Sequence, residues 1–211
     1  MSYETFYKAV VLARMAEICD AFEMTHAQAA FDGDEDAAFS LSISLSNDKR
    51  GDVAVAMWKA KVRREAFRLF FLNVWNHDHR YVIAAAQTRR RLGYMFRYAA
   101  FPLPANLPET VTVWRGTSYL PFDDARAGYS WSTDRDLACW FAMRFADCNG
   151  SPLLLAADIA KSDIALFTNS RSESEVVLMR PPAVRIDGDI NDWTVCYQRK
   201  KDTMKFEQKT F

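Results

Sequence analysis

Val111-Thr112-Val113-Trp114-Arg115-Gly116 begins the part of the chain in which short β-strand patterns follow one another. Its two valines and its arginine recur with a period of two, which predicts a strand over Val111–Arg115. The guanidinium is then expected to emerge where the buried face of that strand ends. Six later runs have the composition of short strands. They are Gly128–Thr133, Leu153–Asp158, Ile164–Phe167, Glu175–Arg180, Ala183–Ile186 and Trp193–Arg199.

One helix is predicted between these strands. Thr133-Asp134-Arg135-Asp136 resembles a capping box with Asp in place of the usual Glu or Gln, and one of its first two residues is expected to be the cap. Leu137, Phe141 and Phe145 follow at i, i+4 and i+8, which is typical of an amphipathic helix with one apolar stripe.

The first hundred residues are predicted to be mainly helical, because apolar residues recur there at helical spacing. Turn signals interrupt the pattern at residues 31–36 and 47–51, and the segment Leu41–Leu45 between them fits either strand or helix. The predicted helices are Tyr3 to about Met24, Val53–Trp75 and Tyr81–Tyr98.

Three prolines end the helical part, because proline removes a backbone donor and disfavours helix in the residue before it. They are Pro102, Pro104 and Pro108. We therefore expect an α+β fold in which residues 1–108 form a helical region that packs on or covers a β-rich core of residues 109–211.

Composition places the chain among packed globular proteins, since 50% of its 211 residues are hydrophobic and 14% are aromatic. A formal net charge of zero argues against a surface devoted to phosphate backbones or an anionic membrane. Basic clusters remain at residues 59–64, 89–91 and 199–209, and we interpret them as solvated surface. Scattered cysteines, together with the lack of a signal-peptide or membrane-span pattern, predict a cytoplasmic protein with free thiols.

The spacing of the seven glycines excludes several nucleotide and hydrolase motifs. No two glycines are close enough to form G-x-G-x-x-G, the P-loop or G-x-S-x-G. His77 and His79 flank Asp78 without a metal-binding spacing, so no metal is expected. If a nucleotide binds, side chains and not a glycine-rich turn must hold it.

Arg115 and Gly116 are the first candidates for such a site. A guanidinium offers a rigid fork of donors suited to phosphate, and a glycine beside it lets a ligand approach the main chain. Ser132 is the second candidate, because its hydroxyl can brace a carboxylate and an arginine. Each of these residues also has an ordinary structural interpretation, as a strand-end arginine or a serine before a helix cap.

Glu173 and Glu175 are the third candidates. In a strand, residues two apart point to one side, so both carboxylates would meet the same substrate. One carboxylate can stabilise an oxocarbenium-like cation while the other accepts a proton. A charged turn before the buried strand is the structural alternative.

Together, Val113-Trp114-Arg115-Gly116, Tyr129-Ser130-Trp131-Ser132-Thr133 and Glu173-Ser174-Glu175-Val176-Val177-Leu178 resemble the R–S–E signature of the mono-ADP-ribosyltransferases, which cleave NAD+ and transfer ADP-ribose to a target. The resemblance covers roughly Val111 to Tyr197. It implies a split β-sandwich of two antiparallel sheets with NAD+, the co-substrate, in the cleft between them. The E-x-E spacing resembles the arginine-modifying members, whereas Asp134 departs from the third position of the family's Ser-Thr-Ser motif.

The resemblance also implies roles for individual residues. Arg115 would contact the NAD+ phosphate or ribose, Gly116 the nicotinamide amide, and Ser132 would orient the site with Thr133 beside it on the cofactor. Glu175 would be the catalytic glutamate on the nicotinamide ribose, with Glu173 activating the target nucleophile. The loop Thr168–Ser172 would face the target, with Phe167 and Ser172 as the contact candidates.

These observations favour an NAD+-dependent mono-ADP-ribosyltransferase acting on a macromolecule, with protein arginine as the favoured acceptor. Because the chain lacks export signals, it resembles an intracellular toxin, a phage-encoded host modifier or an effector delivered into a host cytoplasm. An inhibitor or antitoxin is then a possible partner, and a membrane is not. Two alternatives stay open, namely RNA or DNA as the acceptor, and an inactive ADP-ribosyltransferase-like interaction module.

Overall fold

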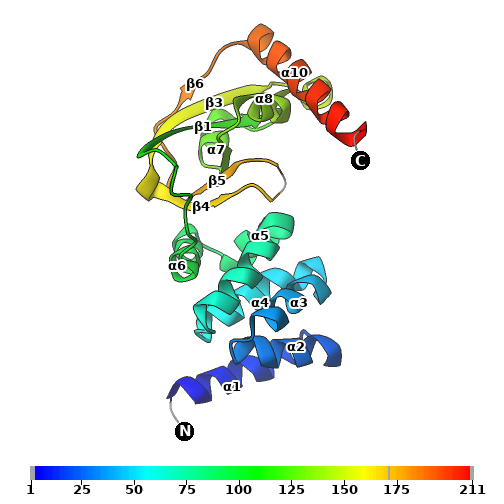
Figure 1. The fold of residues 1–211 in the computed structure, drawn as a ribbon, viewed down its shortest axis with the longest axis vertical. Coiled ribbons are helices and arrows are strands. Elements are labelled where there is room, and N and C mark those ends of the chain that lie inside the picture. Colours follow the sequence, from blue (N-terminus) through cyan, green and yellow to red (C-terminus); the bar gives the residue numbers. More distant parts are fainter. Residues whose placement is uncertain (1–2, 171, 210–211) are drawn as a thin grey trace. The chain divides into compact units, whose positions relative to one another are not determined.

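The computed structural model describes residues 3–170 and 172–209, and the chain divides into two compact units, Met1–Phe101 and Pro102–Phe211. The first unit is helical, and the second contains an antiparallel sheet with helices (Figure 1). This confirms the predicted α+β class with its helical N-terminal half. We had expected the β-rich core to begin after residue 108. Residues 102–108 instead belong to the second unit, where Leu103 and Leu107 pack against the core of the sheet.

Helices that contact one another through aromatic side chains build the first unit. The ring of Phe96 lies 4.9 Å from that of Phe71 and 4.9 Å from that of Trp75, measured between centroids, and all three side chains are buried. Such edge-to-face contacts add to the stabilisation from burial itself. The helices are α1 Tyr3–Met15, α2 Ala21–Phe31, α3 Glu35–Ser44, α4 Asn47–Lys59, α5 Arg64–Ala86 and α6 Arg89–Ala99.

The predicted helix boundaries in this unit need correction. The helix expected to run from Tyr3 to Met24 is two helices, because Asp20 and Glu23 form a capping box that starts α2, with both hydrogen bonds at 2.8 Å. Residues with positive φ, Lys61 at 54° and Gln87 at 61°, divide the other two predicted helices.

The turn predicted at residues 47–51 is wrong, because these residues form the first turns of α4. Gly51 is needed for packing and not for a turn, since a Cβ there would lie 2.2 Å from the carbonyl oxygen of Tyr81 in α5. The ambiguous segment Leu41–Leu45 is helical up to Ser44, the last residue of α3.

The second unit is built around one six-stranded antiparallel sheet with the strand order β4-β5-β2-β1-β3-β6. Six of the predicted strands are present, but those predicted over Gly128–Thr133, Glu175–Arg180 and Ala183–Ile186 are shorter than expected. The strands are β1 Thr110–Thr117, β2 Ser130–Ser132, β3 Leu153–Ala160, β4 Ile164–Thr168, β5 Glu175–Leu178 and β6 Arg185–Ile186. The helices are α7 Phe122–Arg126, α8 Arg135–Met143, α9 Ala146–Asn149 and α10 Ile190–Lys209, with a 3₁₀ turn at Lys161–Asp163.

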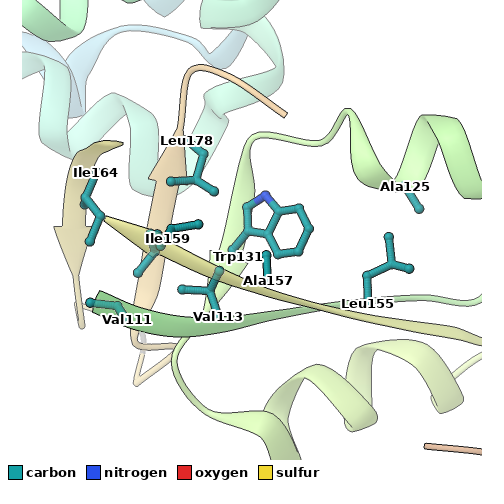
Figure 2. Packing of buried hydrophobic residues seen from close by; sticks show 10 residues of the cluster. Val111, Val113, Ala125, Trp131, Leu155, Ala157, Ile159, Ile164 and Leu178 are labelled. Carbon is teal, nitrogen blue, oxygen red and sulfur yellow. The ribbon is translucent and has the colours of Figure 1, made fainter. Parts of the chain in front are cut away.

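One face of the sheet carries the larger apolar cluster (Figure 2). Trp131 of β2 lies in it with Val113 of β1 and Leu155 of β3, and Ala125 of α7 covers the same side. These residues alternate with polar ones along β1 and β2, as expected for a strand with one buried face. The cluster therefore fixes which side chains of β1 and β2 point away from it.

Helices α8 and α10 cover the opposite face of the sheet. Asp134 is the N-cap of α8, with its carboxylate accepting from the N–H of Leu137 at 3.1 Å, which settles which residue of the predicted box is the cap. Cys139 of α8 and Trp193 and Cys196 of α10 are buried in one cluster with Leu154 of β3.

The strand predicted over Trp193–Arg199 is wrong, because this segment lies in α10. Trp193 and Cys196 are buried at helical spacing, whereas Val195, which made the sequence look alternating, is 65% exposed. The missed signal is Asp189, whose carboxylate accepts from the N–H groups of Asn191 and Asp192 at the start of the helix. Within residues 3–170 and 172–209, no helix has both the length and the apolar character needed to cross a bilayer.

The sheet consists of two three-stranded halves that meet along a narrow seam. Among the described residues, β1 and β3 are paired through eight residue pairs, whereas β1 and β2 are paired only at Trp114 and Ser132. The resemblance predicted two separate sheets, and the strands instead form one sheet that is continuous through this single pair. Beyond it, β1 continues beside β3 and β2 continues beside β5.

Candidate active site

The three sequence pieces that carry the candidate residues lie on adjacent strands in the middle of the sheet. The register places Trp114 opposite Ser132, and Ser132 opposite Glu175, across β1, β2 and β5. Side chains that oppose each other in this way have Cβ atoms about 4.5–5.5 Å apart. Ser132 and Glu175 are both buried, with exposed fractions of 6% and 5%. The seam therefore brings together residues that are far apart in the chain.

Ser132 holds the turn that carries the two glutamates. Its hydroxyl donates to the carbonyl oxygen of Glu173 at 2.7 Å and accepts from the N–H of Asp134 at 2.9 Å. The N–H of Thr133 donates to the carbonyl oxygen of Ser174 at 3.1 Å. We had expected this hydroxyl to bond a carboxylate. Because a hydroxyl has a single proton, Ser132 instead donates it to the main chain of the turn.

The turn before Glu175 has an unusual backbone. Ser172 and Ser174 have φ values of 55° and 45°, in the left-handed region that costs energy for residues other than glycine. Asn169 stabilises this conformation, because its Oδ1 accepts from the N–H of Ser174 at 2.9 Å. Glu175 begins β5, but Glu173 lies in the turn, so strand alternation does not determine the side to which Glu173 points.

Arg115 lies on the face of β1 that carries Val113, and its side chain extends to β2. Nη1 donates to the carbonyl oxygen of Ser130 at 2.5 Å. Gly128 provides the space, since a Cβ there would lie 2.2 Å from Cζ of Arg115. Burial lowers the pKa of Arg115, while nearby Tyr119 and Glu175 act in the opposite direction.

The Nε of Arg115 is buried and has no hydrogen-bond partner in the part of the chain that the structure describes. Leaving a buried donor unpaired costs about 1–3 kcal/mol, and more for a charged group. An anionic ligand is the chemical partner that would satisfy it, because a guanidinium binds phosphate and carboxylate oxygens best.

We had expected a glycine at position 116 in order to let a ligand approach the main chain, but packing against α8 requires it. A Cβ on this residue would lie 1.8 Å from the carbonyl oxygen of Ala138 and 2.7 Å from the nitrogen of Ala142, both in α8. The absent side chain therefore allows close packing of α8 on β1, and it does not open a path to a ligand from that side.

Arg144, at the end of α8, was not among the predicted site residues. Its guanidinium lies over three rings of its own segment, with Cζ 4.7 Å from the centroid of Trp140, 4.6 Å from that of Phe141 and 4.9 Å from that of Phe145. Partial desolvation lowers the pKa of the exposed Arg144, and nearby Glu173 and Tyr119 counteract this. Nothing in the local sequence distinguishes Arg144 from a solvated helix-end cation.

Tyr119 links the two arginines, since it acts on the pKa of Arg115 and also on that of Arg144. It follows β1 directly and is 63% exposed. Glu175 acts on one guanidinium and Glu173 on the other. Each of the two cations is thus within electrostatic reach of one of the two carboxylates.

The predicted target contacts differ in their surroundings. Phe167 is half-buried, pairs with Val176 and packs against the apolar cluster of the sheet. Ser172 is exposed, in the turn that Asn169 begins. Residue 171 of the predicted target-facing loop lies outside the described residues.

Within the described ranges, no group of three or more His, Cys, Asp and Glu side chains is placed to hold a metal ion. Comparisons of the chain with protein-family models, with curated proteins and with solved structures found no match.

Proposed function

We propose that the protein is an NAD+-dependent mono-ADP-ribosyltransferase that modifies a macromolecule, with protein arginine as the favoured acceptor. The observation that supports this best is the pairing of Ser132 with Glu175 across β2 and β5. Glu175 also acts on the pKa of Arg115, although Arg115 lies on the other face of its strand. The order of Arg115, Ser132 and Glu175 in the chain is the basis of the resemblance to mono-ADP-ribosyltransferases. Their positions on three adjacent strands agree with the site that this activity requires.

The two arginines suit the pyrophosphate of NAD+. Arg115 has a buried Nε without a hydrogen-bond partner among the described residues, and Arg144 is held over aromatic rings near Glu173. Cation–π contacts of this kind orient a guanidinium while leaving its donors available. In this proposal Arg115 and Arg144 bind the phosphates.

The carboxylates suit the chemistry at the nicotinamide ribose. The C–N bond to nicotinamide breaks with its electron pair leaving on nicotinamide, and the ribose carbon acquires oxocarbenium character. Glu175, fixed and buried, stabilises that positive charge as it develops. A nitrogen of the acceptor arginine then attacks the ribose carbon, and Glu173 accepts the proton that this nitrogen loses.

The test is to incubate the protein with NAD+ and a cell lysate, and to measure released nicotinamide together with a mass increment on macromolecules. Glu175→Gln should abolish both signals with folding intact, because it removes the charge and keeps the shape. Glu65→Gln, at an exposed position of α5, is the matched control and should retain them. Equal activity of Glu175→Gln and the original protein would exclude the assignment.

The same reaction mixture distinguishes the acceptor. Label that survives nuclease and is removed by protease is on protein, and mass spectrometry then identifies the modified atom. Label that nuclease removes would make RNA or DNA the acceptor and would overturn the choice of arginine while retaining the reaction.

A further inference from the structure

The helical unit has an uneven distribution of charge that the neutral total conceals. Residues 1–48 contain two Lys and Arg against nine Asp and Glu, whereas residues 49–101 contain twelve Lys and Arg against three Asp and Glu. The second segment therefore has a net charge of +9 within about fifty residues. Charge asymmetry of this size within one compact unit indicates an anionic partner for the basic part.

Helix α6 carries the densest part of this charge. It has four arginines and no acidic residue among its eleven positions. Arg90, Tyr94 and Arg97 are exposed at i, i+4 and i+7, so they line one face of the helix. Arg90 Nε donates to the Tyr94 hydroxyl at 3.0 Å, and Cζ of Arg97 lies 4.5 Å from the centroid of the same ring. Both guanidiniums lower the pKa of Tyr94.

The turn between α4 and α5 extends this face. Lys61 is exposed, and its Nζ lies 5.2 Å from the ring centroid of Trp58 and 5.0 Å from that of Tyr98. Tyr98 is one turn of α6 beyond Tyr94 and is tied to the α4–α5 turn by its hydroxyl, which donates to the carbonyl oxygen of Val62 at 2.7 Å. Three cations and three rings thus form one surface, which we call the basic strip.

The cations of the basic strip are available to a partner. In the described part of the chain, no carboxylate forms an ion pair with Lys61, Arg90 or Arg97. By contrast, the exposed Arg63 nearby is paired with Glu35 at 3.1 Å. The distance along α6 from Arg90 to Arg97 is about 10 Å, from a rise of about 1.5 Å per residue. That span corresponds to about three nucleotides of a strand, at about 3.4 Å each.

We propose that the basic strip binds the phosphate backbone of nucleic acid. Cations interleaved with aromatic rings are the surface that nucleic acid requires, because phosphates pair with the cations and bases stack on the rings. The strip contains no aliphatic side chain of the kind that membrane-binding helices insert, so an anionic bilayer fits it less well. This binding does not depend on NAD+ or on the residues of the candidate active site.

The experiment measures binding of the full chain, without NAD+, to a fluorescein-labelled 20-nucleotide RNA of mixed sequence and to a DNA duplex of the same length. Fluorescence anisotropy at a series of salt concentrations gives the slope of log affinity against log salt. Lys61→Gln/Arg90→Gln/Arg97→Gln should weaken binding at 50 mM salt at least tenfold. It should also reduce the magnitude of the slope for the single strand by about 2, since each phosphate contact contributes about 0.7.

Arg14→Gln/Arg80→Gln/Arg180→Gln is the matched control, because it removes three exposed cations that are outside the basic strip and form no ion pair with the described residues. It should change affinity less than threefold, and circular dichroism should show both triple variants folded. Lys61→Arg/Arg90→Lys/Arg97→Lys keeps the charge and should retain binding. Absence of binding by the original protein at 50 mM salt, or equal losses in the two glutamine triples, overturns the proposal. Capture by phosphatidylglycerol vesicles with no nucleic-acid binding would overturn it in favour of a membrane surface.

Discussion

Ser132 Oγ lies 2.7 Å from the carbonyl oxygen of Glu173, to which it donates its only proton. The serine of the R–S–E pattern is therefore a positioning residue for the glutamate turn, and it acts on Glu173 through the main chain. It also satisfies the N–H of Asp134, so one buried hydroxyl joins the end of β2, the start of α8 and the turn before β5.

Ser132→Ala should destabilise the protein by about 1–3 kcal/mol, because it leaves a partly buried carbonyl and a partly buried N–H without this partner. It should also lower the rate of NAD+ cleavage more than it lowers NAD+ affinity, since the displaced group is the glutamate turn. Urea unfolding and nicotinamide release measure the two effects. Ser162→Ala, at an exposed position, should change neither. A Ser132→Ala variant with unaltered stability would contradict the bonding described here.

Gly128→Ala should displace the guanidinium of Arg115. The new methyl group would lie 2.2 Å from Cζ, a distance that forces the side chain to move. We expect at least a tenfold loss of NAD+ affinity by calorimetry, which is about 1.4 kcal/mol. Gly150→Ala is the contrasting variant, because its Cβ meets nothing within 4 Å although its φ is +97°. It should lower stability and leave NAD+ affinity unchanged, and equal affinities of the two variants would refute the steric argument.

Asp134 should make stability depend on pH in the acidic range. Partial burial raises the pKa of its carboxyl, but the hydrogen bond from Lys200 and that from the N–H of Leu137 lower it by more, so the pKa ends below its ordinary value. The stabilisation is thus present above the unfolded pKa, about 3.9, and is lost as pH falls through the folded value.

The measurement is the free energy of unfolding of Asp134→Asn and the original protein between pH 2 and 7. Asparagine is also a good N-cap, so mainly the ionic contribution is removed. The variant should be less stable near pH 7, and the difference should shrink as pH falls below about 4. Lys200→Gln should show the same trend, and a difference that grows on acidification would show that the sign is wrong.

The four thiols should differ in reactivity. Burial raises the pKa of Cys139 to about 12 and that of Cys19 to about 11, so neither forms thiolate near neutral pH. Cys196 is buried beside Cys139, whereas Cys148 is exposed. Titration with a chromogenic disulfide at pH 8 should therefore detect one fast thiol in the folded protein and four after denaturation. Cys148→Ser should remove the fast thiol, and a fast phase that persists in this variant would contradict the burial of the others.

The strands were predictable from sequence because their signal is local. Val111 and Val113 recur with a period of two, Trp131 stands between two serines, and Val176 lies in a short apolar run, so each strand has a signal of its own. The α10 segment failed the same test, since Trp193, Val195 and Tyr197 imitate alternation. Its helical state depends on the cap at Asp189, which is a local signal, and on packing against α8, which is a tertiary contact that periodicity does not show.

The candidate site was predictable only in part. Arg115, Ser132 and Glu175 were found through their order in the chain, and the register then placed them on adjacent strands. Arg144 and Tyr119 were missed, because the approach of Arg144 to Glu173 and of Tyr119 to the arginines depends on where α8 ends and how the chain leaves β1. Gly116 was assigned to a ligand, although contact with Ala138 explains it. Packing between elements decides such cases, and periodicity does not report it.

Among the described residues, the two halves of the sheet are joined at the seam only through the pair of Trp114 and Ser132. Little backbone pairing joins the halves there, so the packing of Trp131 against Val113 and Leu155 in the apolar cluster helps to hold them together. A bound molecule that contacts Arg115 on one half and Glu175 on the other would crosslink the two halves, and its binding would reduce their motion relative to each other.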